Sequence, residues 1–199
     1  MASSQISVEE FWKVFPWQSF VPSLKVDFAL FFCGYKKVIR SRCLEGALPT
    51  ESCLRKVGLK MLVDAKRYVF FATSDSYIKE AVVLDLSTTP HEYAFGKLLG
   101  YPECCVRKME TIGESNIDEY AETFCKQDFT SPHLNIKYYS SGIALISHIP
   151  CSLECNSSHK MADACRSFVK RLQDQGVQDP WVGQISFFAS GAVREANPC

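Results

Sequence analysis

LGYPECC (residues 99–105) and HIPCSLEC (residues 148–155) are the two stretches around which the chain is organised. Each contains a proline and two cysteines, and each leads into a helical pattern. Proline is tolerated at the first position of a helix, so Pro102 and Pro150 predict two helix starts. The N-terminus of a helix lowers the pKa of a thiol and favours thiolates. We therefore expect two helix ends that face each other and share a four-sulfur site.

The predicted metal ligands of this site are Cys104, Cys105, Cys151 and Cys155. Cys151 and Cys155 lie one turn apart on a predicted helix, so both sulfurs can reach one centre. Cys104 and Cys105 are adjacent, which is awkward for one tetrahedral zinc because zinc ligand pairs are usually separated by about two to four residues. The iron corners of a cubane accommodate neighbouring cysteines more easily. The pattern therefore favours an iron–sulfur cluster as cofactor, with zinc as the alternative.

Two other interpretations of the cysteines need no metal. Free cysteine is common in protein cores, so the thiols could simply pack helix ends. A transient or catalytic disulfide, or a persulfide carrier, is also open. His148 lies three residues before Cys151 and could supply a ligand, a proton or a hydrogen bond, while Tyr101 could stack on a bound group. His148 and Cys151 are thus candidate catalytic residues, and Tyr101 is a candidate cofactor-binding residue.

Composition and charge narrow the class of protein. The chain is 47% hydrophobic, with 22 basic and 22 acidic residues, which argues against disorder and against a broad nucleic-acid surface. The apolar run at residues 28–33 is far shorter than the ~20 residues of a membrane span. Residues 1–10 lack the pattern of a signal peptide. We expect a cytoplasmic protein, where clustered cysteines indicate metal or catalysis more often than disulfides. The protein could act on a small-molecule substrate. Its net charge does not point to any partner, and the sequence does not reveal the oligomeric state.

Hydrophobic periodicity predicts an α+β fold, with a small β-sheet covered by helices and the cysteine site between two helix N-termini. We expect a single domain over residues 1–199, with about the first six residues disordered. The predicted helices are 8–15, 25–33, 51–57 with a possible extension over 60–64, 90–99, 102–111, 117–126 and 150–175. The predicted strands are 68–73, 81–86 and 184–189. The basic segment Lys36–Arg42 is interpreted as a solvated strand edge in preference to an anion-binding segment.

The two cysteine segments together resemble an uncharacterised, mainly prokaryotic family with a GYPxCC motif and a later HxPCSxxC motif. The resemblance covers the central and C-terminal half of the chain. It implies a shared site and no particular reaction, since no activity is established for that family. The residues that match the motifs are Gly100, Tyr101, Pro102, Cys104, Cys105, His148, Pro150, Cys151, Ser152 and Cys155.

The leading functional hypothesis is an iron–sulfur enzyme, a transferase or a lyase. Three cysteines would hold a [4Fe-4S]-type cubane and leave one iron open to substrate or sulfide, for sulfur-transfer or Lewis-acid chemistry. One alternative is an interaction module in which a closed zinc site fixes two helices. Another is a metal-free thiol or persulfide enzyme that uses Cys151 near His148. Phosphate-loop, dinucleotide-binding, serine-hydrolase and zinc-protease motifs are absent from the sequence.

Overall fold

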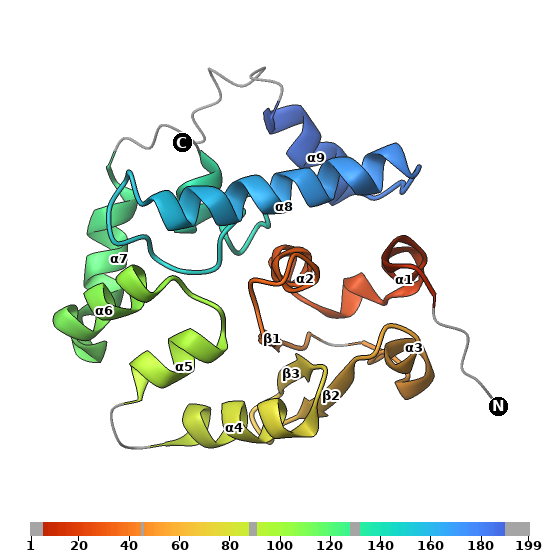
Figure 1. The fold of residues 1–199 in the computed structure, drawn as a ribbon, viewed down its shortest axis with the longest axis horizontal. Coiled ribbons are helices and arrows are strands. Elements are labelled where there is room, and N and C mark those ends of the chain that lie inside the picture. Colours follow the sequence, from red (N-terminus) through yellow and green to blue (C-terminus); the bar gives the residue numbers. More distant parts are fainter. Residues whose placement is uncertain (1–5, 45, 88–90, 128–131, 190–199) are drawn as a thin grey trace.

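The computed structural model describes residues 6–44, 46–87, 91–127 and 132–189, which form a single α+β body (Figure 1). The predicted fold class is confirmed. The α-helices are α1 (Val8–Val14), α2 (Leu24–Phe32), α3 (Glu51–Arg55), α4 (Asp75–Leu86), α5 (Glu92–Leu98), α6 (Glu103–Ile112), α7 (Ile117–Cys125), α8 (Asn156–Asp174) and α9 (Pro180–Ala189). Short 3-10 helices are η1 (Trp17–Ser19), η2 (Glu114–Asn116), η3 (Pro132–Leu134) and η4 (Ile136–Tyr138).

A three-stranded antiparallel sheet lies at the centre of the lower half of the molecule in Figure 1. Its strands are β1 (Val38–Arg42), β2 (Lys60–Val63) and β3 (Tyr68–Ala72), in the order β1-β3-β2. Alternate side chains of a strand point to opposite faces. On one face, Ile39 pairs with Phe71 and joins the core formed with α1, α2, α8 and α9. On the other, Phe70 packs in a second core with Ile78 of α4 and Leu98 of α5.

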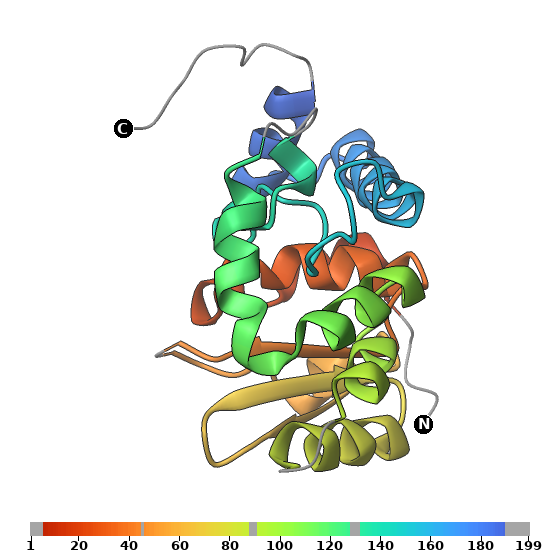
Figure 2. The ribbon, with the colours of Figure 1, turned by 90° about the vertical axis from the view of Figure 1, so that its left-hand side faces the viewer.

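The helices form layers on this sheet, as Figure 2 shows from the side. α4 covers the lower face, α2 crosses above the sheet, and α8 and α9 lie beyond α2. α5, α6 and α7 run up one side of the molecule, from the level of α4 to the level of α8. This connection brings α6 to the same side of the molecule as the start of α8, where the cysteines lie.

Three predicted elements were wrong. Residues 81–86 belong to α4, which begins upstream where Ser74 accepts a hydrogen bond from the Tyr77 N–H at 3.3 Å. Residues 184–189 belong to α9, because Pro180 starts a helix whose Trp181 N–H donates to Asp179 at 2.8 Å. Residues 60–63 form β2 and do not extend α3, since the chain turns at Gly58, where φ is +71°.

The basic segment Lys36–Arg42 includes an edge strand, as predicted, but two of its cations are paired inside the molecule. The Lys36 side chain is 2% exposed, and its ammonium lies 3.0 Å from Asp27 of α2. Arg40 lies 2.9 Å from Asp85 of α4 and stacks 3.7 Å from the centre of the Tyr68 ring. The prediction that this segment is solvated is therefore wrong for Lys36, whose ammonium is buried in an ion pair with Asp27.

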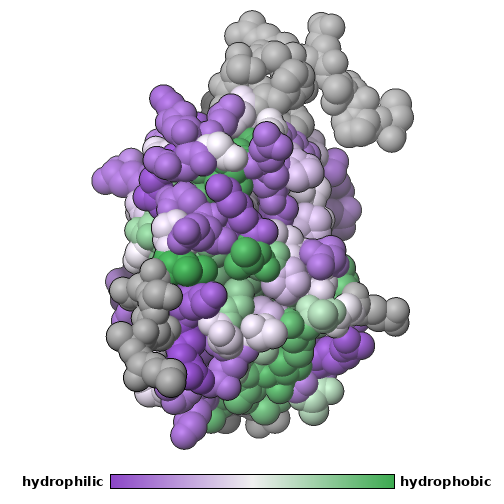
Figure 3. Space-filling view, turned by 90° about the vertical axis from the view of Figure 1, so that its right-hand side faces the viewer, coloured by the Kyte–Doolittle hydropathy of each residue, from purple (hydrophilic) through white to green (hydrophobic). Residues whose placement is uncertain are grey.

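Apolar surface gathers in the lower part of the face shown in Figure 3. The edge strand β2 contributes to the exposed apolar side chains of the molecule, with Leu62 37% and Val63 39% exposed. No helix of the described residues is long and apolar enough to cross a membrane. The predicted helix start at Pro90 lies outside the described residues, as does nearly all of the N-terminal stretch predicted to be disordered.

Candidate metal centre

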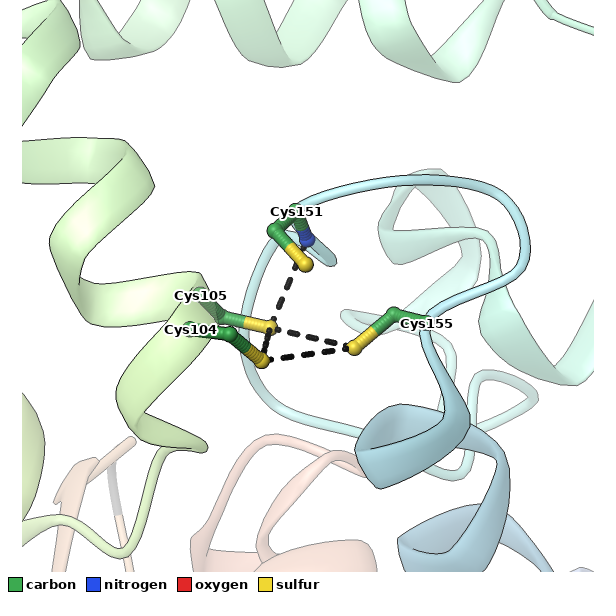
Figure 4. A group of neighbouring side chains, drawn as sticks. All are labelled: Cys104, Cys105, Cys151 and Cys155. Atoms are coloured by element: carbon green, nitrogen blue, oxygen red, sulfur yellow. Dashed lines mark hydrogen bonds between the residues drawn. The ribbon is translucent and has the colours of Figure 1, made fainter.

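The four predicted ligands converge on one point (Figure 4). Cys104 and Cys105 lie in the first turn of α6, Cys151 lies in the loop before α8, and Cys155 is the N-cap residue of α8. Their four sulfur atoms all lie within 4.8 Å of one another. The predicted meeting of two cysteine pairs about fifty residues apart is confirmed.

The spacing of the sulfurs is close to that around a single tetrahedral ion. The Sγ atom of Cys104 is 3.9 Å from that of Cys105 and 3.7 Å from that of Cys155, and Cys105 is 3.6 Å from Cys155. With metal–sulfur bonds of about 2.3 Å, the sulfurs of a tetrahedral site are about 3.8 Å apart. Three of the sulfurs thus have the spacing of a single tetrahedral ion, and the group of four could hold one metal ion.

The second cysteine pair is positioned differently from the prediction. α8 begins at Asn156, so Pro150 does not start a helix and Cys151 is not on one. Instead, residues 151–154 form turns, and the Cys155 N–H bonds the Ser152 carbonyl at 3.2 Å. The Cys151 N–H donates to the Cys105 sulfur at 3.4 Å. The backbone N–H of Cys151 thus bonds a sulfur of the site and takes no part in a helix. This contact places Cys151 next to Cys105.

The site has a buried side and a solvent side. Cys105 is 1% and Cys155 is 6% exposed, whereas Cys151 is half-buried and Cys104 is exposed. On the buried side the Ser158 hydroxyl lies 3.6 Å from the Cys105 sulfur and 2.9 Å from Nε2 of His148. Ser158 has one proton to donate. If Ser158 donates that proton to a sulfur, it accepts the N–H of His148.

The electrostatics differ among the sulfurs. Burial raises the pKa of Cys105 well above its usual range, against the hydrogen bond from Ser158. Burial and the neighbouring thiols raise the pKa of Cys151 to about 11. For Cys155, burial acts in the same direction, but hydrogen bonds from the side chain and backbone of Ser158 and from the Cys151 and Cys105 thiols together outweigh it and lower the pKa to about 6. Burial, helped by the Lys36 charge, lowers the pKa of His148 to about 3, so this imidazole is neutral at pH 7.

Residues 65–173, more than half of the 199-residue chain, match a family described as proteins of unknown function, DUF483. The chain belongs to the DUF483 family. The match includes both cysteine segments and hence all four sulfurs of the site. No curated protein and no solved structure matches the chain. The sequence predicted membership of a family without an assigned reaction, and DUF483 is a family of unknown function.

In this DUF483 chain the two other predicted site residues contact each other. The rings of Tyr101 and His148 are tilted by 35° with their centres 5.5 Å apart. The Lys36 ammonium lies 5.1 Å from the centre of the Tyr101 ring. His148 is 5% exposed, and its Nδ1 has no hydrogen-bond partner among the described residues. Both residues therefore contact the protein interior beside the sulfurs, and their predicted catalytic and cofactor-binding roles stay predictions.

A second contact holds the GYPECC segment of the DUF483 chain in place. Lys36 donates to the Leu99 carbonyl at 3.1 Å. Gly100 has φ +80°, and a Cβ atom there would lie 2.0 Å from the Tyr35 carbonyl oxygen. Only glycine fits so close to the backbone in this conformation. Sequence reasoning missed Lys36 and Ser158 as supporting residues, although Ser158 is three residues after Cys155, where an N-cap side chain finds its partner.

Proposed function

We propose that this protein binds one zinc ion through Cys104, Cys105, Cys151 and Cys155, and that the ion fixes α6 to the start of α8. The spacing of 3.6–3.9 Å among three of the sulfurs carries the proposal. Closed sites of four cysteines are typical of structural zinc, and the binding free energy of such an ion contributes directly to folding. The protein is then a zinc-stabilised α+β module. We further propose that the paired motifs are the metal site of DUF483.

The same distances favour zinc over the iron–sulfur hypothesis. The sequence favours a cubane because adjacent cysteines are awkward ligands for one tetrahedral zinc. The sulfurs of Cys104 and Cys105 are only 3.9 Å apart, which answers that objection. A cubane binds each thiolate through a different iron, so its ligand sulfurs are farther apart than around a single ion. All four sulfurs here lie within 4.8 Å of one another, which supports a site with one metal ion.

The surroundings of the sulfurs also support a metal site more than a metal-free thiol enzyme. A thiol nucleophile is activated by a base within hydrogen-bond reach. The Nε2 atom of His148 is engaged by the Ser158 hydroxyl, so it is not directed at a sulfur. Donors to the sulfurs come from Ser158 and from the Cys151 backbone, an arrangement that stabilises metal-bound thiolates. We therefore give His148 a supporting role, through Ser158.

The test is metal and sulfide analysis of protein purified without oxygen from cells supplied with both zinc and iron. We expect about one zinc per chain, no acid-labile sulfide and a colourless protein. Cys105→Ser should lose the zinc, and Cys53→Ser, which changes a half-buried cysteine of α3, should keep it. A brown protein with iron and sulfide would instead establish the cubane. Protein without bound metal, and without uptake of added zinc, would refute both.

A further inference from the structure

The four sulfurs are not equivalent, and Cys104 differs from the rest. Its side chain is exposed, whereas Cys105 and Cys155 are buried. Cys105 receives the Cys151 N–H and contacts the Ser158 hydroxyl, at 3.4 Å and 3.6 Å. Among the described residues, the hydrogen-bond contacts of the Cys104 sulfur are with other sulfurs. Hydrogen bonds to a ligand tune and hold it on a metal, so Cys104, which is also more exposed than the other three cysteines, is held less firmly than Cys105.

A cation lies on the same face of α6 as this exposed sulfur. Lys108 follows Cys104 by four residues, which places the two on one side of the helix. Its neighbour Arg107 pairs with Glu103 at 2.7 Å, whereas Lys108 has no ion pair among the described residues and lies 5.9 Å from the centre of the Tyr120 ring. An ammonium without an ion pair, on the same helix face as an exposed cysteine of the site, favours an incoming anion.

We propose that Cys104 is the exchangeable ligand of the metal site, and that an anionic low-molecular-weight thiol takes its place on the ion. The inference rests on the proposed function. In the exchange, the incoming thiol loses its proton and forms a metal–sulfur bond. The bond from Cys104 to the metal breaks, and its thiolate takes up the released proton. No electron is transferred, and the ion stays bound through Cys105, Cys151 and Cys155.

The experiment uses cobalt(II) as a spectroscopic substitute for zinc in the full chain under anaerobic conditions. Cys104→Ala should still bind one cobalt, with sulfur-to-cobalt charge-transfer absorption lower by about one quarter, since three thiolates replace four. Added mercaptoacetate should restore the missing absorption. Cys105→Ala should lose cobalt binding, and Cys53→Ala should behave like the wild type. Circular dichroism of each metal-free variant checks that it is folded, and Cys104→Ser provides a second variant at the exchange position.

Two comparisons test the anionic preference. Mercaptoacetate should bind the Cys104→Ala protein more tightly than cysteamine, which carries a positive charge. Adding Lys108→Gln should weaken mercaptoacetate binding about twofold to fivefold, as expected for a solvent-exposed charge. Cobalt loss by Cys104→Ala as complete as by Cys105→Ala would overturn the inference while leaving the proposed function intact. So would absorption that mercaptoacetate does not change. A wild-type protein that binds neither cobalt nor zinc overturns both.

Discussion

Replacing Lys36 by methionine removes one charge of an ion pair buried beside the segment that leads to the cysteines. The side chains of Lys36 and Asp27 are 2% and 3% exposed, with nitrogen and oxygen 3.0 Å apart. The Tyr139 hydroxyl donates to the other carboxylate oxygen of Asp27 at 2.5 Å. After the substitution the carboxylate stays buried with this hydroxyl and without a cation. The Leu99 carbonyl also loses the donor that it has at 3.1 Å.

The magnitude follows from the charge left behind. Removing one partner of a buried ion pair costs about 3–5 kcal/mol, because the other charge is then uncompensated. We expect Lys36→Met to lower the free energy of unfolding by about 4 kcal/mol, a large share of the roughly 5–15 kcal/mol typical of a domain. Adding Asp27→Asn removes the stranded charge. The double variant should therefore lose about 2 kcal/mol less than the sum of the two single variants.

Urea denaturation of the zinc-loaded proteins, followed by circular dichroism, measures these differences. Lys37→Met is the matched control, since it makes the same change at the next residue, which is exposed and lies 5.7 Å from the centre of the Tyr77 ring. Its effect should stay within about 0.5 kcal/mol. A loss below about 1 kcal/mol for Lys36→Met, or strictly additive effects with Asp27→Asn, would refute the idea that this pair holds the segment in place.

Three further predictions concern the site and its supports. Ser158→Ala should weaken zinc binding about 10- to 100-fold in chelator competition, while the exposed Ser157→Ala should not change it. Gly100→Ala should lower stability by about 3 kcal/mol or more. Gly34→Ala, at φ +81° with no atom within 4 Å of the added Cβ and with the same helix-ending hydrogen bonds as Gly100, should lose only the ~1–2 kcal/mol of backbone strain, as urea midpoints will show. Free zinc at 100 times its Kd should stabilise the protein by about 2.7 kcal/mol, and a midpoint insensitive to zinc contradicts the site.

Signals that act within one helical turn predicted the structure well. The Ser7 hydroxyl and the Glu10 carboxylate cap α1 reciprocally, at 3.1 Å and 2.8 Å, as the capping-box pattern indicates. Gly34 and Gly100 follow the ends of α2 and α5 with φ near +80°. Such signals depend mainly on neighbouring residues, although the proline signal at Pro150 failed, because α8 begins only at Asn156.

Short apolar runs were less informative, because six residues do not distinguish a strand from part of a buried helix. Residues 81–86 are rich in β-branched and aliphatic side chains, yet Ala81 faces the sheet while Val83 is 68% exposed. That difference follows the helical repeat of α4. The helix start at Ser74 lies outside the run itself, so the run taken alone predicted a strand. The same holds for residues 184–189, whose helix begins at Pro180.

The number of metal atoms that a four-cysteine site holds is hard to predict from sequence, and the reason is geometric. Ligand spacing along the chain says which sulfurs can meet, and the two cysteine pairs do meet. Whether they enclose one ion or a cluster depends on the separation between α6 and the loop 148–155. Groups distant in sequence contact the two sides of this separation: Lys36 donates to the Leu99 carbonyl, and Ser158 contacts both Cys105 and His148. Because these supports hold the sulfurs at the spacing of one tetrahedral ion, a substitution that loosens them should weaken zinc binding even though every cysteine remains.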